Sequence, residues 1–208
     1  MIKKATIIIV DYHMGNILSI VNKIKRIGYE AIVTNEINLI KKADKIILPG
    51  VGHFQKAIEN LNQLQLLDVL NETVLLRKTP IMGICLGMQL LARHSEEGNV
   101  NGLNWLNAEV VKFKINDQLK YKVPHIGWNN AIVKKKSSLF TGLSEDSMFY
   151  FVHSYHMVCN DEKDILTQTE YEYSFTSSVQ KDNIFGTQFH PEKSHDAGEV
   201  LLRNFINL

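Results

Sequence analysis

The segment at residues 80–89 constrains the fold more than any other part of the chain. It begins with a proline and a short apolar run, as buried strands often do, and continues into apolar residues at helical spacing. At the junction, Cys85 has Gly83 and Gly87 two positions away on either side. This is the Gly-x-nucleophile-x-Gly spacing of a nucleophile elbow, a turn too sharp for side chains on its flanks, with cysteine in place of serine. The segment therefore predicts a buried strand that turns directly into a helix.

An elbow of this kind would place Cys85 at the N-terminus of a helix. Unpaired N–H groups and the helix dipole at that position favour a thiolate, and the same N–H groups, Leu86 first, can stabilise an oxyanion. The alternative is a buried cysteine in a tight strand-to-helix turn that carries no chemistry. Residues 80–89 alone leave both interpretations open, because short elbow-like patterns also occur by chance.

The first half of the chain alternates between strand-like and helix-like segments. Strands are expected at residues 6–10, 31–33 and 45–48, and helices at residues 17–27, 36–43, 53–62 and 64–77. Such an order is typical of α/β proteins with a doubly wound parallel sheet. Ligands of these sheets bind beyond the carboxyl ends of the strands, and Asp11, Pro49 and Cys85 all follow predicted strands.

The second half, after His94, has a different pattern. Short strand-like runs replace the alternation, and helices become scarce until the last stretch. Strands are expected at residues 108–113, 130–133, 148–152, 165–169, 175–179 and 184–189, and a helix at residues 197–205. We therefore expect a partly antiparallel β layer that completes the mostly parallel sheet. No break in composition separates the halves, so residues 1–208 are expected to form one domain.

Composition and charge argue against several classes of function. The chain has 208 residues, of which 45% are hydrophobic, and a formal net charge of +1. Charges of both signs are mixed throughout, which gives no case for binding nucleic acid or a membrane surface. No apolar stretch is long enough to span a bilayer, and two cysteines, Cys85 and Cys159, do not suggest a disulfide framework. A cytoplasmic enzyme is the expectation.

A second chemical motif lies near the end of the chain. His190 and Glu192 stand two positions apart at the end of a predicted strand, with Pro191 fixing the backbone between them. Side chains two apart on a strand point to the same face. A thiol nucleophile needs an imidazole as its base, and a carboxylate on the other ring nitrogen commonly orients that imidazole. Together with the elbow, this motif predicts a catalytic triad of Cys85, His190 and Glu192.

Residues 49–52, Pro-Gly-Val-Gly, close a predicted strand. Turn chemistry accounts for every residue, so the loop alone favours a tight turn. The alternative is a mobile segment that supplies part of an oxyanion hole, because Gly50 and Gly52 would let the peptide unit of Val51 rotate at little cost.

His153 and His156 stand three positions apart and raise the question of a metal site. A metal would need further His, Cys or carboxylate ligands at suitable spacing, and none lies nearby in the sequence. We therefore expect neither a metal nor another cofactor. The pair is interpreted as part of a strand that ends at a polar pocket wall.

These motifs are recognisable as a set. Residues 83–89, Gly-Ile-Cys-Leu-Gly-Met-Gln, and residues 189–192, Phe-His-Pro-Glu, resemble the class I glutamine amidotransferases. Within that class the chain closely resembles the glutaminase subunits of imidazole glycerol phosphate synthases, the enzymes of the histidine pathway. Residues 11–16, 49–54, 124–129, 150–155 and 188–194 carry this second likeness, which therefore spans nearly the whole chain.

The resemblance implies a reaction and a role for each motif. In the family, the cysteine attacks the carboxamide of L-glutamine, the histidine shuttles the proton to the departing ammonia, and water releases glutamate from the thioester. The implied catalytic residues are Cys85, His190 and Glu192, the implied oxyanion residues are Gly50, Val51, Gly52 and Leu86, and the implied substrate contacts are Gln89, Glu97, Ser154 and Tyr155. The likeness thus reverses the preference for a plain turn at residues 49–52.

The resemblance also implies a partner. Ammonia would pass to a (β/α)8-barrel cyclase subunit, which closes imidazole glycerol phosphate and releases an aminoimidazole carboxamide ribotide. The two chains would form a heterodimer. The residues that match family positions facing this subunit are Asn16, Trp128, Asn129 and Lys193.

One departure from the family pattern lies at His13, where the motif Asp-Tyr-Gly-x-Gly-Asn usually has its first glycine. A histidine would be strained at φ > 0, so we expect a change in this partner-facing loop. One alternative is therefore a paralogous glutaminase that feeds ammonia to an amidotransferase of bacterial surface sugars. Two others are a non-catalytic binding subunit, opposed by the intact triad, and a cysteine peptidase, opposed by Gln89.

Overall fold

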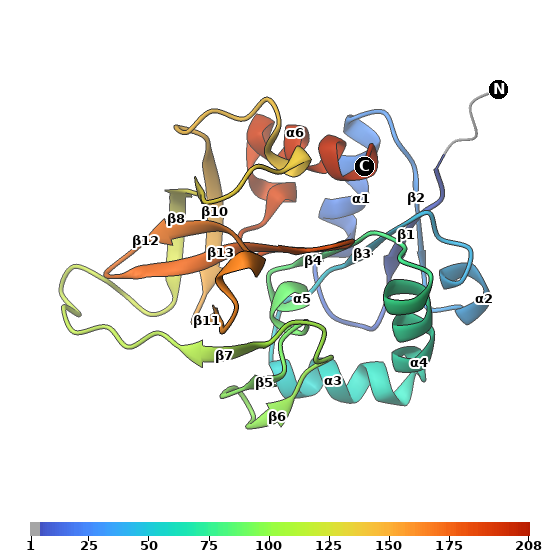
Figure 1. The fold of residues 1–208 in the computed structure, drawn as a ribbon, viewed down its shortest axis with the longest axis horizontal. Coiled ribbons are helices and arrows are strands. Elements are labelled where there is room, and N and C mark those ends of the chain that lie inside the picture. The colour runs from blue at the N-terminus through green and yellow to red at the C-terminus, as the bar shows by residue number, and fades with distance from the viewer. Residues whose placement is uncertain (1–4) are drawn as a thin grey trace.

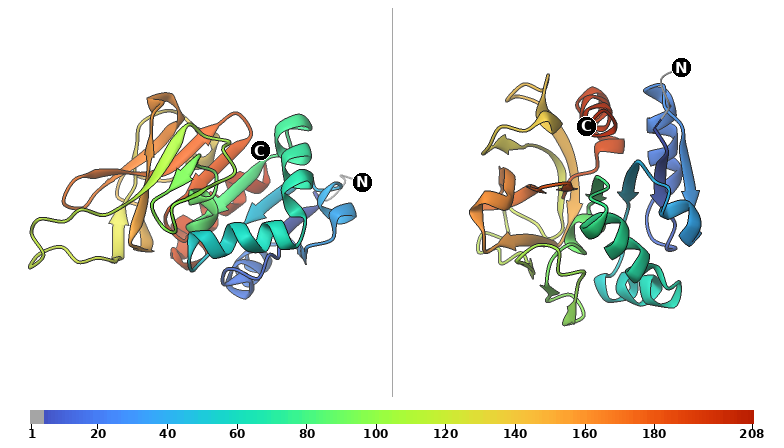
Figure 2. Two further views of the ribbon diagram at one scale, coloured as in Figure 1. Left: turned by 90° about the horizontal axis from the view of Figure 1, so that it is seen from below. Right: turned by 45° about the vertical axis from the view of Figure 1, so that its right-hand side comes forward.

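The computed structural model describes residues 5–208 (Figure 1). Its N-terminal half is a parallel sheet between helices, and its C-terminal half consists mostly of antiparallel strands. Figure 2 shows the strands of the C-terminal half, in yellow and orange, gathered beside the helices of the N-terminal half. None of the helices within residues 5–208 is long and apolar enough to cross a membrane.

The parallel strands form the doubly wound sheet that the sequence predicts. Strands β2, β1, β3 and β4 lie side by side in that order, and β14 joins β4 in parallel. These strands are β1 Ile7–Val10, β2 Ala31–Thr34, β3 Lys45–Leu48, β4 Ile81–Ile84 and β14 Ile184–Thr187. The helices are α1 Ile17–Arg26, α2 Ile37–Ile40, α3 Phe54–Gln63, α4 Leu66–Asn71, α5 Leu86–Gln89 and α6 His195–Ile206.

Alternate side chains of β1 face opposite layers of helices. Ile7 and Ile9 belong to the apolar cluster that includes residues of α1 and α6, whereas Ile8 and Val10 belong to the cluster with residues of α3 and α4. All four side chains are buried. Because burying an aliphatic side chain of this size contributes about 1.5–3 kcal/mol, such a β-branched run is favoured between two helical layers.

The antiparallel half extends the same sheet. From β14 the order continues through β13, β11, β7, β5 and β6, while β12 pairs with β13 and β9, and β8 pairs with β10 as a separate ribbon. These strands are β5 His94–Ser95, β6 Val100–Asn101, β7 Ala108–Lys112, β8 His125–Asn130, β9 Ile132–Val133, β10 Met148–His153, β11 Tyr155–Cys159, β12 Ile165–Glu170 and β13 Ser174–Lys181. Single helical turns follow at Glu72–Leu76, Ser138–Phe140, Glu162–Asp164 and Pro191–Lys193.

Several strands of this half differ from the sequence-based prediction. Strands β5 and β6 and residues 125–129 of β8 were not predicted, and instead of one strand at residues 130–133, β8 ends at Asn130 and β9 begins at Ile132. Strand β11 was not predicted, and it follows β10 after a single residue, Ser154. At Ser154 the chain leaves the β8–β10 ribbon and enters the main sheet. Such a change of sheet depends on long-range pairing, so no local pattern reveals it.

The backbones of β3 and α5 approach each other closely at the carboxyl end of the sheet. A Cβ atom on Gly87 would lie 1.9 Å from the carbonyl oxygen of Leu48, and one on Gly83 would lie 2.5 Å from the carbonyl oxygen of Gly87. Only glycine leaves room for this approach. The contact sets Cys85 directly beside the loop that follows β3.

We predict that Gly87→Ala destabilises the protein by about 1–3 kcal/mol or more, since overpacking a rigid interior has this cost. Urea unfolding would measure it. Gly28→Ala is a matched control, because Gly28 has a φ of +91° but no atom within 4 Å of its Cβ position. The free energy of unfolding of that control should fall only by the cost of backbone strain, about 1–2 kcal/mol. A smaller loss in Gly87→Ala than in Gly28→Ala would contradict the close contact.

Candidate active site

Cys85 occupies the turn between β4 and α5 in a strained backbone conformation. Its φ is 54° and its ψ is −107°, and a residue with a side chain is strained there by about 1–3 kcal/mol. The Cys85 N–H donates to the carbonyl oxygen of Thr187 at 2.7 Å, which ties the turn to the end of β14. A strained turn of this kind is what a nucleophile elbow requires.

His190 and Glu192 form a buried pair beside the cysteine. Their atoms Nδ1 and Oε1 lie 2.8 Å apart, and each side chain is 2% exposed. The predicted strand does not reach them, because β14 ends at Thr187 and Glu192 lies in the 3₁₀ turn Pro191–Lys193. The expectation that both side chains leave one strand is therefore wrong. The turn brings the carboxylate onto the imidazole instead.

The backbone around His190 is fixed on strand β10. Its N–H donates to the Tyr150 carbonyl oxygen at 2.9 Å. The Ser194 hydroxyl donates to the His190 carbonyl oxygen at 2.6 Å and accepts from the Tyr150 N–H at 3.0 Å. These bonds hold the imidazole in place independently of its own side-chain contacts.

Opposing effects act on the pKa of His190. Burial lowers it, but the interactions with Cys85 and Glu192 outweigh burial and raise the pKa from 6.5 to about 9. Among residues 5–208, the ring Nε2 has no hydrogen-bond partner at close range, so the Cys85 sulfur acts on it from a longer distance. A raised pKa keeps the imidazole protonated at neutral pH, which is the state that pairs with a thiolate.

A cavity of about 540 Å³ opens at Cys85, a size suited to a small ligand. It gathers expected residues from distant parts of the chain. The lining residues are Asn16, Val51, Gly52, Cys85, Leu86, Gln89, Glu97, Pro124, Val152, His153, Ser154, Tyr155 and Lys193. Trp128 and Asn129, expected at the partner interface, lie outside this lining on β8.

Residues 49–52, which follow β3, accept a hydrogen bond from one of the expected oxyanion donors, the Leu86 N–H. The Leu86 N–H donates to the carbonyl oxygen of Gly50 at 3.3 Å. The buried Tyr12 hydroxyl donates to the carbonyl oxygen of Pro49, and burial, followed by the charge of Cys85, raises the pKa of Tyr12 so that it stays a donor. A Cβ atom on Gly50 would lie 2.7 Å from the Tyr12 oxygen. The segment is therefore packed in a closed form in which the Leu86 N–H is not free.

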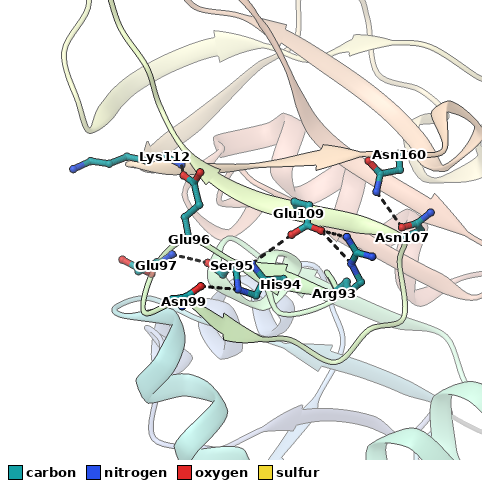
Figure 3. A network of polar contacts seen from close by, with 10 residues as sticks. All are labelled: Arg93, His94, Ser95, Glu96, Glu97, Asn99, Asn107, Glu109, Lys112 and Asn160. Atoms are coloured by element: carbon teal, nitrogen blue, oxygen red, sulfur yellow. Dashed lines mark hydrogen bonds and ion pairs between the residues drawn. The ribbon is translucent and has the colours of Figure 1, made fainter.

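Glu97 connects the cavity to the start of α3. It lies between β5 and β6, and its Oε2 accepts from the Phe54 N–H at 2.8 Å, which caps the helix. Figure 3 shows the polar network that holds this turn and the neighbouring β7. The contacts are Glu109 with Arg93 and His94, His94 with Asn99, Ser95 with Glu97, Glu96 with the Lys112 N–H, and Asn107 with Asn160.

Two of the residues expected to face a partner lie at the cavity. Asn16 caps α1, with its side-chain oxygen accepting from the Ser19 N–H at 3.3 Å. The Lys193 ammonium lies over the Tyr150 ring, 5.5 Å from its centre. His13, in the same loop as Asn16, has a φ of 63°, the left-handed conformation that strains a residue with a side chain.

The other two lie along β8. Trp128 is 41% exposed, and its ring stacks on His195 with centres 4.8 Å apart. The Asn129 amide donates to the Glu170 carbonyl oxygen at 2.8 Å. The sequence did not single out His195, whose place under Trp128 depends on the fold. It also missed Gln188, although that residue directly precedes the Phe-His-Pro-Glu motif.

The two histidines of β10 and β11 have separate partners. His153 Nδ1 contacts the Tyr155 carbonyl oxygen at 2.8 Å, and His156 Nε2 contacts the Tyr173 hydroxyl at 2.9 Å. In the described part of the chain, no group of three or more His, Cys, Asp or Glu residues could hold a metal ion. His153 lies in the cavity wall, as the sequence suggested.

Comparison with known proteins identifies the class. The family profile described as glutamine amidotransferase class-I matches residues 8–208. The chain belongs to this family. Solved structures agree on the fold: PurLQS from Thermotoga maritima superposes with a TM-score of 0.73 at 18% identity and covers 98% of each chain. A structure titled glutamine amidotransferase gives 0.72 at 20% identity, over 96% of this chain and 97% of that one.

Curated relatives narrow the class to one group, the proteins named imidazole glycerol phosphate synthase subunit HisH. The chain is 55% identical to HisH 2 of Methanococcus maripaludis, over 96% of this chain and 98% of that protein. It is 45% identical to HisH 2 of Pseudomonas aeruginosa, over 97% and 99% of the two chains. HisH 1 of Campylobacter jejuni is 44% identical, over 97% and 100%.

We predict that Glu192→Gln lowers the rate of glutamine hydrolysis about a hundred- to ten-thousandfold, because the imidazole loses the charge that orients it. Glutamate release would measure this loss. Glu199→Gln is the matched control, since Glu199 pairs with Lys23 and Arg26 outside the cavity lining. Equal rates of glutamate release in the two variants would show that Glu192 takes no part and that the enzyme uses a Cys–His dyad.

The raised pKa of His190 predicts an alkaline limb in the pH profile near pH 9. The protonated ring gains stability from its partners in the folded state, so this contribution is complete below pH 6.5 and is lost as the pH rises through about 9. Activity should fall there, because the departing ammonia needs the imidazolium proton. The histidine therefore does not set the acid limb. Measured kcat/KM should show the limb, and Glu192→Gln should move it to lower pH; a limb unmoved in that variant would not belong to His190.

Proposed function

We propose that this protein is the glutaminase subunit of an imidazole glycerol phosphate synthase. It hydrolyses L-glutamine to L-glutamate and ammonia, and a cyclase subunit uses the ammonia to make imidazole glycerol phosphate and aminoimidazole carboxamide ribotide in histidine biosynthesis. The observation that carries this proposal is the strained Cys85 in a cavity beside the buried His190–Glu192 pair. Near-full-length identity to proteins named HisH supports the pathway. We expect the protein to act in the cytoplasm.

The first half of the reaction uses all three triad residues. The Cys85 thiolate attacks the carboxamide carbon, so that a C–S bond forms and the carbonyl electron pair moves to oxygen. The His190 imidazolium then gives its Nε2 proton to the amide nitrogen as the C–N bond breaks. Ammonia leaves and a thioester remains, while Glu192 keeps the ring oriented through Nδ1.

The second half returns the enzyme to its starting state. Water attacks the thioester carbon while the neutral His190 takes one of its protons. The C–S bond breaks, glutamate leaves, and Cys85 becomes a thiolate again beside the imidazolium. The raised pKa of His190 favours this ion pair as the resting state.

The cavity supplies groups for the amino-acid end of glutamine. Glu97 brings a carboxylate that suits the α-ammonium group, and Gln89, Ser154 and Tyr155 bring polar groups to the same wall. Glu97 also caps α3, the helix that follows the oxyanion segment. The Glu97 side chain would therefore contact the substrate and also hold the start of the helix that follows the oxyanion segment.

The oxyanion segment gives the subunit an idle state. With the Gly50 carbonyl on the Leu86 N–H, that donor cannot stabilise the tetrahedral intermediate. Rotation of the Gly50–Val51 peptide unit would release Leu86 and aim a second N–H, from Val51, into the same space. A partner that contacts the rotated form more favourably would shift the population towards it.

The partner we propose is a cyclase subunit built as a (β/α)8 barrel. Asn16 and Lys193 line the cavity, and Trp128 and Asn129 lie along β8. A subunit that covers this face would enclose the mouth, so that ammonia passes from Cys85 to the second site without escaping into water.

A second candidate partner is an amidotransferase of bacterial surface sugars. The observation that favours it is His13, whose φ of 63° strains a loop that ends at the cavity residue Asn16. A strained residue near an interface is a place where partner choice can differ. The glutaminase chemistry would be the same in both complexes.

We predict that the lone subunit is nearly idle and that docking of a loaded partner raises glutamate release at least about a hundredfold, the usual effect of one oxyanion donor. Glutamate release would be measured for the lone subunit, then with a barrel cyclase and its nucleotide ligand, then with a sugar amidotransferase. Full activity of the lone subunit would contradict the idle state. Stimulation by the sugar enzyme alone would overturn the histidine-pathway assignment.

Two variants control this experiment. Cys85→Ala should abolish glutamine-dependent turnover while the complex still uses added ammonium salt. Cys159→Ala should remain active, because burial raises the pKa of the Cys159 thiol to about 12 and it lies outside the cavity lining. A folded Cys159→Ala variant without activity would contradict the choice of nucleophile. Release of peptide fragments instead of glutamate would indicate a peptidase, and the absence of any turnover would indicate a binding subunit.

A further inference from the structure

The side chain of Gln188 touches the reacting sulfur atom. Gln188 follows β14 directly and is 0% exposed. Its Nε2 lies 3.6 Å from the Sγ of Cys85, within the range of an N–H···S hydrogen bond. The Gln188 N–H donates to the Ser177 carbonyl oxygen at 2.9 Å, so the backbone of this residue is held by β13.

Neighbouring groups fix the orientation of this amide. Gln89 Nε2 donates both to the Tyr155 carbonyl oxygen and to Gln188 Oε1, each at 3.0 Å. Because Gln89 presents its donor to Gln188, the oxygen of Gln188 faces Gln89 and its NH₂ group faces Cys85. An amide of opposite orientation would place two donors against each other.

The Tyr155 carbonyl that positions Gln89 is itself held by a buried pair of histidines. His153 Nδ1 donates to this carbonyl at 2.8 Å, and His125 Nδ1 lies 3.1 Å from His153 Nε2. Burial lowers the pKa of His125 to about 4 and the pKa of His153 well below 6.5, so both rings are neutral. With Nδ1 of His153 as a donor, its Nε2 is the acceptor for His125. His153 and Gln89 therefore both donate to the Tyr155 carbonyl oxygen, which is fixed between them.

A thiolate in this buried turn needs donors. Cys85 is 7% exposed, and besides Gln188 and the His190 ring, whose pKa its sulfur raises, the sulfur contacts the Val152 carbonyl oxygen at 3.9 Å. A carbonyl can accept the proton of a thiol but repels a thiolate. The Gln188 amide is a donor, and a hydrogen bond to a charged group is stronger than one between neutral groups.

We propose that Gln188 is a further catalytic residue, whose side-chain amide donates to the Cys85 sulfur and stabilises the thiolate, and that Gln89 is the residue that aims it. The naming of the reaction rests on the function proposed above, but the contact with the sulfur does not. The Gln89 amide nitrogen donates to Tyr155 and Gln188, so its oxygen remains to accept from the α-ammonium group of the substrate. One pair of amides thus links the amino end of glutamine to the nucleophile.

The test compares Gln188→Met, Gln188→Glu and a control, Gln180→Met. Methionine matches the size of glutamine but has no donor. Glutamate keeps the shape and still accepts from Gln89, but it places a negative oxygen on the sulfur. Gln180 is a partly buried glutamine of β13 whose Oε1 has no hydrogen-bond partner within residues 5–208. It pairs with Phe185 near the start of β14, whereas Gln188 follows the end of that strand, so its replacement leaves the surroundings of Cys85 intact.

The first readout is the rate at which iodoacetamide alkylates Cys85 at mildly acid pH, followed by mass spectrometry of the peptide that contains it. We expect Gln188→Met to slow alkylation about three- to tenfold. Loss of the donor lowers the fraction of Cys85 present as thiolate, but the thiolate of a more basic thiol is a better nucleophile, which offsets about half of this loss on a logarithmic scale. Gln188→Glu should be slower still, and Gln180→Met should match the wild type. The second readout is kcat for glutamate release in the complex, which should fall in the same order.

The order of the two variants decides the matter. A residue that only fills space would be replaced better by the isosteric glutamate, which keeps the bond from Gln89, than by methionine. The proposal would therefore be overturned if Cys85 were alkylated in Gln188→Glu as fast as, or faster than, in Gln188→Met. Wild-type alkylation rates in both variants would also overturn it. Ammonium-driven turnover of each complex reports whether the variant has folded and docked. If the wild type released no glutamate with any partner, the proposed function would fail, while alkylation would still test the contact.

Discussion

The close approach of backbone to backbone between β3 and α5 is the constraint on which the rest of the site depends. With Gly87 against the Leu48 carbonyl, the chain must turn from β4 into α5 within one residue, and that residue, Cys85, takes a positive φ. The same approach brings the loop after β3 onto the first N–H of α5. One packing contact thus sets the positions of both Cys85 and the proposed oxyanion segment, and the glycines are needed for this geometry.

Around this turn the protein holds histidines in opposite states of protonation. His190 is as buried as His125, yet its pKa is raised while that of His125 is lowered. The difference lies in the partners: a carboxylate and a thiol for His190, and a second imidazole and aromatic rings for His125. A charged ring can exchange protons with the substrate, whereas a neutral ring of fixed tautomer can hold a carbonyl in place. The site needs both.

Much of this could be predicted from the sequence, because the signals were local. The β-branched runs, the Gly-x-Cys-x-Gly spacing and the alternation of strand and helix specify the parallel half and the position of Cys85. The pairing of His190 with Glu192 was predicted for the wrong reason, since a 3₁₀ turn and not a strand joins them. Strand β11 and the contact of Gln188 with the sulfur could not be predicted, because both depend on which distant strands become neighbours.

In the gating proposed here, the bond between the Leu86 N–H and the Gly50 carbonyl limits how inactive the free subunit can be. At 3.3 Å it is a long bond, and a typical one contributes about 0.5–1.5 kcal/mol net, which corresponds to about a two- to thirteenfold preference for the closed form. A hundredfold preference requires about 2.7 kcal/mol. The contact placed to supply the remainder is the one that the buried Tyr12 hydroxyl makes with the Pro49 carbonyl oxygen. The rate at which the free subunit would release ammonia without an acceptor is therefore a property that the Tyr12 hydroxyl, which contacts the segment and not the thiol, is placed to adjust.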